Sequence, residues 1–148
     1  MSSLENLVRI GQLKLEPSSD GEIVTSLRRA ALYLVDAALP SLSPPSRFML
    51  AYDAAHALAF AALRANGYRP DAGRGHRAVV FQTLGVTIGA SQQPWLTLDR
   101  YHTRRNASEY GDMVEASASE AEDLLMAAQE LQALFRHWLV RNRPPVLV

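Results

Sequence analysis

The stretch that decides the fold runs from residue 43 to residue 67 and reads SPPSRFMLAYDAAHALAFAALRANG. Ser43 can cap a helix, and Pro44 suits the first turn, where a backbone N–H would have no helical partner. Asn66 and Gly67 are typical of a helix C-terminus. We therefore predict a central helix, close-packed because its alanines let neighbours approach. Its apolar residues form two adjoining stripes at spacings of three and four: Phe48, Tyr52, Ala55, Ala59 and Ala62, then Met49, His56, Phe60 and Leu63.

Two other segments show the same helical periodicity. One begins at Glu22 and stops before Pro40, with Arg28 and Arg29 on its polar side, where we expect both to be solvated. The other is capped by Ser117 or Ser119 and is the most regular in the chain. Their inward residues are Ile23, Leu27, Ala30, Leu34 and Ala38 in the first, and Leu124, Ala128, Leu131, Phe135 and Trp138 in the second.

The remaining segments are less regular. Residues 3–14 are predicted to form a short helix, and residues 68–75 a turn-rich linker. Residues 76–88 contain valine-rich runs that could form a strand. We favour a third bundle helix there, because the sequence offers no convincing partner strand. A fourth helix is predicted over residues 95–111, between a loop and Gly111.

These elements predict an all-α fold, an antiparallel up-down four-helix bundle with a short additional N-terminal helix. The whole chain of 148 residues is expected to be one domain. Within it, residues 1–20 form the accessory N-terminal helix and turn, and residues 22–141 form the bundle.

The composition limits the possible functions. Fifteen basic residues balance fifteen acidic ones, so no overall charge favours nucleic acid or a membrane surface. The chain has no cysteine, which excludes disulfides and thiolate chemistry. No apolar run approaches the ~20 residues of a membrane span, and the N-terminus lacks signal-peptide features. We expect a soluble, cytoplasmic protein with no membrane contact.

Polar side chains are concentrated in residues 100–112, which read RYHTRRNASEYGD. On a helix, His102, Arg105 and Glu109 would share one face. The inward face of this helix would be apolar at its start and charged towards its end. The charged part must meet a polar partner, because an unpaired buried arginine is very costly. Asp53 and His56, about one turn apart on the central helix, are candidate partners.

Residues 105–110, RNASEY, resemble the signature of the HEPN superfamily, an arginine and a polar residue followed by a spacer and a histidine. Residues 52–59, YDAAHALA, resemble an alanine-rich early helix of that family. Residues 62–70, ALRANGYRP, with Gly75-His76 after them, resemble a helix end and Gly-His passage found in some members. The resemblance covers about residues 22–140.

HEPN domains are helical bundles, commonly dimeric, and many are metal-independent ribonucleases of toxin–antitoxin or other defence systems. The resemblance implies that Arg105 stabilises charge on a phosphate and that Asn106 is the accompanying polar residue. Tyr110 stands where the family has its proton-transferring histidine, and an ordinary phenol has a pKa near ~10. His102 lies nearby but precedes the arginine. We expect Arg100, Arg104, Asp53 and His56 to bind substrate, with no metal or other cofactor.

Two functions remain open. The chain could be a HEPN-type enzyme acting on RNA or nucleotides, the toxin half of a pair with a nucleotidyltransferase-like antitoxin. Alternatively, Tyr110 marks a catalytically degenerate bundle that serves as an interaction module, as a homodimer or with a nucleotidyltransferase partner. The same residues can also be interpreted as purely structural. Arg105, Asn106 and Tyr110 would then stabilise a helix end or a dimer contact. His102 would cap a helix or form an inter-helix hydrogen bond, and His56 would pack in the core.

Overall fold

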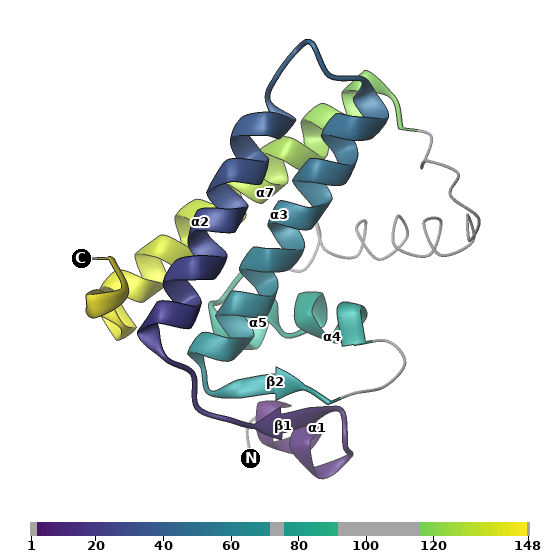
Figure 1. Ribbon diagram of the computed structural model, residues 1–148. Helices are drawn as coiled ribbons and strands as arrows, with labels where there is room; N and C mark the ends of the chain where they lie inside the picture. The colour runs from purple at the N-terminus through teal and green to yellow at the C-terminus, as the bar shows by residue number, and fades with distance from the viewer. Residues whose placement is uncertain (1–2, 72–75, 92–115, 148) are drawn as a thin grey trace.

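The computed structural model describes residues 3–71, 76–91 and 116–147, and this part of the chain is mainly helical (Figure 1). The all-α fold class is therefore confirmed. The elements in chain order are α1 (Ser3–Arg9), β1 (Leu13–Leu15), α2 (Asp20–Ala37), α3 (Pro44–Ala65), β2 (Tyr68–Pro70), α4 (His76–Gln82), α5 (Leu84–Thr87), α7 (Ala118–Asn142) and the 3-10 helix η1 (Pro144–Leu147).

Helix α3 is the centre of the described structure. It packs against α2 along one side and α7 along another, whereas α2 and α7 contact each other sparsely (Figure 1). Many of the buried residues of α3 are alanines, and small side chains let helix backbones come close together. The fully buried alanines of α3 are Ala51, Ala54, Ala55, Ala59, Ala61 and Ala62. The predicted central, alanine-rich helix is confirmed.

Serines begin the three long helices. The Ser19 hydroxyl accepts a hydrogen bond from the Glu22 amide at 3.1 Å, and Ser43 accepts one from the Ser46 amide at 3.3 Å. At the start of α7, Ser117 forms a reciprocal capping box with Glu120. Each cap satisfies a backbone donor that the first helical turn leaves unpaired. Of the two serines that the sequence left open, Ser117 is the cap.

The N-terminal segment differs from the prediction. The expected helix over residues 3–14 ends at Arg9, and residues 13–15 form a strand that pairs antiparallel with β2. The register places Leu13 opposite Pro70 and Leu15 opposite Tyr68. Gly11, with φ of 83°, makes the turn that ends the helix, a conformation that favours glycine. The partner strands lie more than fifty residues apart, so local periodicity could not reveal the pairing.

The predicted helix over residues 76–88 is interrupted. It consists of α4 and α5, which meet at Thr83. The buried Thr83 hydroxyl donates to the carbonyl of Val79 at 3.0 Å and contacts that of Val80 at 3.2 Å. Such bonds from threonine to the preceding turn compete with regular helix geometry and bend the chain. The two short helices still bury Val80 and Leu84 against the core.

The predicted fourth helix, residues 95–111, lies outside the described residues, so the four-helix bundle stays a prediction. Within the described stretches, no helix combines the length and the apolar composition that crossing a membrane requires.

Candidate functional site

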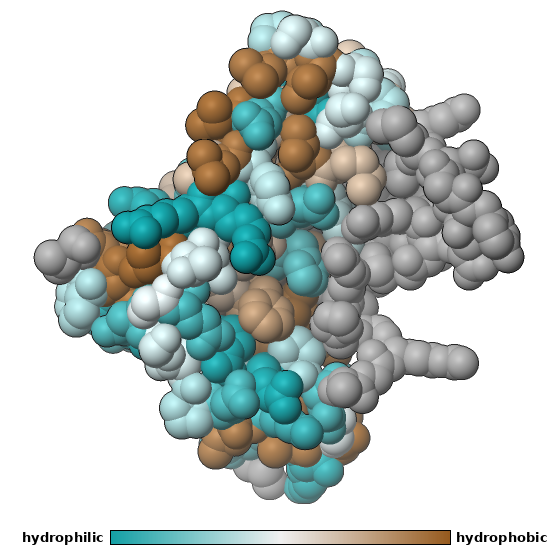
Figure 2. All heavy atoms as spheres, in the orientation of Figure 1, coloured by the Kyte–Doolittle hydropathy of each residue, from teal (hydrophilic) through white to brown (hydrophobic). Residues whose placement is uncertain are grey.

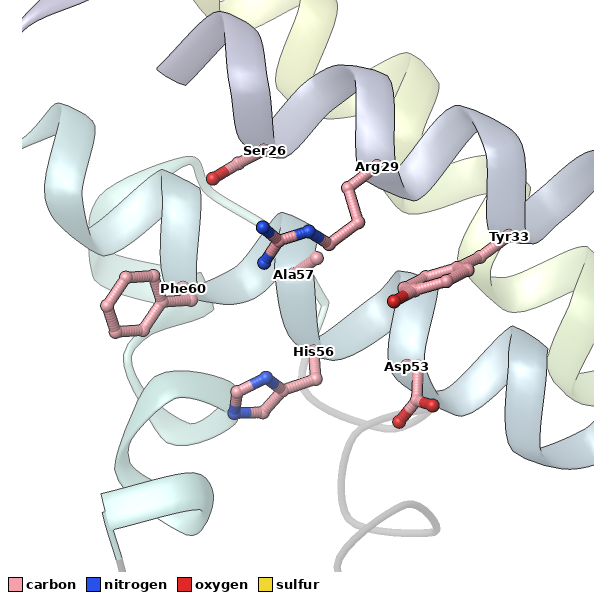
Figure 3. A pocket seen from close by; sticks show the side chains of 7 residues that line it. All are labelled: Ser26, Arg29, Tyr33, Asp53, His56, Ala57 and Phe60. Carbon is pink, nitrogen blue, oxygen red and sulfur yellow. The ribbon is translucent and has the colours of Figure 1, made fainter. Parts of the chain in front are cut away.

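The predicted site residues fall into two groups. Arg100, His102, Arg104, Arg105, Asn106 and Tyr110 lie outside the described residues. Asp53 and His56 lie in α3, and both line one cavity at its junction with α2 (Figure 3). The site that the structure describes is therefore built on these two α3 residues.

The cavity measures about 460 Å³, within the range of small-molecule sites. One wall comes from α2 and the other from α3, two helices that run antiparallel (Figure 1). The lining residues are Ser26, Arg29 and Tyr33 of α2 and Asp53, His56, Ala57 and Phe60 of α3 (Figure 3).

Helical spacing explains why these residues line one cavity. Residues 26, 29 and 33 are three and four apart, so they form one row along α2. Residues 56 and 57 each lie three or four positions from residues 53 and 60, and together they form the matching row along α3. The ends of each row are seven residue steps apart, or about 10 Å at the rise of an α-helix. The methyl group of Ala57 contributes little volume between the rows, which leaves room for a ligand.

His56 belongs to the core and to the cavity. Its ring stacks with Phe60, the centroids 6.4 Å apart and the planes at 25°, and meets the edge of Phe81 at 5.9 Å. The Nε2 atom is buried. The core role that the sequence suggested for His56 and the predicted contact with a ligand are therefore compatible, because packing by two phenylalanines fixes the ring beside the cavity.

Arg29 is the cation of this cavity. We expected it to be solvated, and its side chain is exposed, but it extends over the cavity rather than away from it (Figure 3). In the part of the chain that the structure describes, no carboxylate lies within ion-pair distance of its guanidinium. A guanidinium without an acidic partner can bind an anion from solution.

Several other described arginines, unlike Arg29, are engaged within the protein. The Arg47 Nε donates to the Ala37 carbonyl at 2.7 Å, and its Nη2 lies 2.8 Å from Glu122 Oε2. At the opposite end of the helices, Arg143 donates to Ser18 Oγ at 2.7 Å and pairs with Asp20. These arginines tie helix ends together, which distinguishes them from Arg29.

Arg64 is the most buried of the engaged arginines, with 5% of its surface exposed. Its Nε and Nη2 atoms donate to the two Glu22 carboxylate oxygens at 2.7 and 3.1 Å. Its other donors reach the carbonyls of Glu16, Pro17 and Tyr68. The bond to Arg64 lowers the pKa of Glu22, and the same bond raises the pKa of Arg64. This cluster is saturated by protein groups and is structural.

The surface separates polar and apolar regions. Figure 2 shows hydrophilic side chains across the middle of the visible face and hydrophobic ones towards the end where α2 turns into α3. Exposed apolar residues recur at helical spacing at Leu32 and Val35 of α2 and at Leu39 just beyond its end. They point about a third of a turn away from Ser26, Arg29 and Tyr33. The α2 side of the cavity is therefore a polar row, distinct from this apolar stripe.

The cavity offers a guanidinium, a carboxylate, two hydroxyls and an imidazole. Among the described residues, no group of three histidine, aspartate or glutamate side chains could hold a metal ion. The arrangement can therefore bind a ligand that has an anionic group and hydrogen-bonding groups. Sequence reasoning identified Asp53 and His56 but missed Arg29, because its spacing from Ser26 and Tyr33 does not show which side of α2 meets α3.

No protein-family model, curated protein or solved structure matches this chain.

Proposed function

We propose that this protein is a HEPN-like helical domain that binds RNA or a nucleotide, with the cavity between α2 and α3 as a phosphate-binding site. The family part of the proposal is supported by the sequence resemblance around residues 105–110. The binding part is supported by the position of Arg29 over the cavity, opposite Asp53 and His56 of α3. The position of Arg29 is the observation that carries the proposal.

The chemistry of Arg29 suits a phosphate. A guanidinium presents several N–H donors in a planar fork that matches two phosphate oxygens. Ser26 lies one turn before Arg29 on the same row and supplies a hydroxyl donor. The Asp53 carboxylate repels a phosphate, so we place the phosphate at the Ser26 end of the cavity and the rest of the ligand towards Asp53.

The binding proposal is tested by titration calorimetry with mononucleotides and a short single-stranded RNA. Arg29→Ala should weaken binding by about 10- to 100-fold, since hydrogen bonds to a charged group contribute ~1.5–3 kcal/mol. Arg28→Ala is the matched control, because Arg28 is the neighbouring exposed arginine and does not line the cavity. Equal affinities of the two variants would contradict the assignment of Arg29.

The ribonuclease part of the proposal rests on Arg105 and Asn106. If the resemblance extends to activity, purified protein should cleave RNA in the presence of EDTA, and Arg105→Ala should abolish the cleavage. Binding without cleavage would instead favour the interaction module, with Tyr110 unable to act as the usual proton carrier at neutral pH.

The proposed partners are a second copy of the chain and a nucleotidyltransferase-like antitoxin. Light scattering at micromolar concentration should detect the dimer, and a monomer would contradict a cleft composed of two subunits. Co-expression with the product of a neighbouring nucleotidyltransferase gene should yield a complex that survives gel filtration.

A further inference from the structure

The two ends of the cavity differ in chemistry. Because α2 and α3 run antiparallel, Ser26 lies towards Phe60, and Tyr33 lies towards Asp53 (Figure 3). Arg29 lies between them on α2. One end therefore combines a hydroxyl, an aromatic ring and a nearby guanidinium, and the other combines an aromatic ring and a carboxylate.

We infer that the Tyr33–Asp53 end recognises the guanine base of a nucleotide whose phosphate is bound by Arg29. This inference rests on the proposed nucleotide-binding function and specifies its substrate class. The carboxylate is the deciding group. An ionised carboxylate only accepts hydrogen bonds, through two oxygens side by side, so its best partner offers two adjacent donors.

Guanine meets that requirement on its pairing edge, where N1–H and the N2 amino group are adjacent donors. Adenine and cytosine present an amino donor beside a ring-nitrogen acceptor, and uracil presents one N–H between two carbonyls. Each of these three would direct an acceptor towards a carboxylate oxygen. A site that is built for a hydrogen-bonding group discriminates strongly against an analogue that leaves its polar atoms unpaired.

Asp53 also interacts within the protein. A carboxylate has about four acceptor positions, so protein contacts can orient it while other positions remain for a ligand. Its half-buried position on the rigid helix α3 restricts the side chain further.

Tyr33 supplies the surface on which the base can stack. Its ring is half-buried and lines the cavity towards Asp53 (Figure 3). Stacking on an aromatic side chain is tolerant of base identity. Tyr33 therefore contributes affinity for any base, whereas Asp53 contributes the choice of guanine.

The experiment compares the monophosphates of guanosine, adenosine, cytidine, uridine, inosine and xanthosine by titration calorimetry. The guanosine nucleotide should bind most tightly. Inosine lacks the N2 amino group and should bind about tenfold more weakly, the loss expected for one charge-assisted hydrogen bond. Tyr33→Ala should weaken all the nucleotides that bind by a similar factor.

Asp53→Asn reverses the hydrogen bonding at one position with little change of shape. The asparagine amide offers one acceptor and one donor, which match N1–H and the C2 carbonyl of xanthine. This variant should lose affinity for the guanosine nucleotide and gain affinity for the xanthosine nucleotide. Asp36→Asn, an exposed aspartate of α2 outside the cavity, is the control and should leave both affinities unchanged. Circular dichroism checks that each variant is folded.

The outcomes separate this inference from the proposal on which it rests. Binding of all four common nucleotides with equal affinity, still dependent on Arg29, would overturn guanine recognition and leave the nucleotide-binding function standing. An unchanged guanine preference in folded Asp53→Asn protein would also overturn the assignment of Asp53. Absence of binding by every nucleotide and by RNA would overturn both.

Discussion

Arg64 of α3 and Glu22 of α2 form a two-point ion pair, with Nε–Oε2 and Nη2–Oε1 distances of 2.7 and 3.1 Å. Arg64 lies near the C-terminal end of α3, and Glu22 lies in the first turn of α2. The pair therefore joins the two helices at one end of their contact. The carbonyls of Glu16 and Pro17, before α2, and of Tyr68, after α3, accept the remaining hydrogen bonds, so one side chain holds three parts of the chain together.

Replacing Arg64 should destabilise the fold strongly. Arg64→Ala leaves the half-buried Glu22 carboxylate and several carbonyls without their donor, and losing hydrogen bonds to a charged group costs about 1.5–3 kcal/mol. Urea unfolding at pH 7 measures the free energy. Arg28→Ala, at an exposed position of α2, should change it by less than ~0.5 kcal/mol. A similarly small effect of Arg64→Ala would contradict the structural role of the cluster.

Stability should depend on pH through Glu22. Its pKa is lowered in the folded protein by the hydrogen bond from Arg64, from an ordinary value of 4.5. The unfolded state therefore binds the proton more readily, and the stabilisation is present above pH 4.5 and lost as the pH falls through the folded pKa. Urea unfolding from pH 7 down to pH 3 measures this loss. Glu22→Gln should show a shallower decline, and parallel curves would rule out Glu22 as the cause.

The N-terminus of α7 should depend on one serine. Ser117→Ala removes a cap that bonds the Glu120 amide at 3.1 Å, and losing such a cap costs about 1 kcal/mol. Thermal unfolding followed by circular dichroism detects a change of this size. Ser119→Ala, inside the first turn of the same helix, is the control and should be neutral or slightly stabilising, because alanine favours helix. The opposite ranking would reassign the cap.

Two alanines of α3 should respond differently to enlargement. Ala59 is fully buried, so Ala59→Leu should cost about 1–3 kcal/mol through overpacking. Ala57 lines the cavity, so Ala57→Leu should leave the unfolding free energy nearly unchanged while it blocks ligand binding. Paired unfolding and calorimetry measurements check both. Unaltered ligand binding by folded Ala57→Leu protein would place the ligand elsewhere.

The sequence predicted the long helices because their evidence is local. The caps at Ser19, Ser43 and Ser117 each contact an amide three residues ahead, and the inward stripes repeat within one helix. The break at Thr83 also has a local cause, yet its hydroxyl can either face solvent or bond the preceding turn. Burial selects the second arrangement, and burial is a property of the packed structure.

Part of the candidate site could be predicted in the same way. Asp53 and His56 attracted attention as polar residues on an otherwise apolar helix. Arg29 did not, because an arginine on the polar side of an amphipathic helix usually lies in solvent. Its contribution depends on which side of α2 meets α3, and helical periodicity within α2 does not specify that orientation.

By itself, the sequence determined the three long helices, the start of one of them uniquely, at Ser43, and the small side chains that let α3 lie at the centre. Only the tertiary structure decided the pairing of β1 with β2, the burial of Arg64 against Glu22 and the convergence of Arg29 with Asp53 and His56. The physical reason is the distance along the chain over which each interaction acts. Caps and periodicity act within a few residues, whereas strand register, buried ion pairs and cavities depend on which distant surfaces pack together.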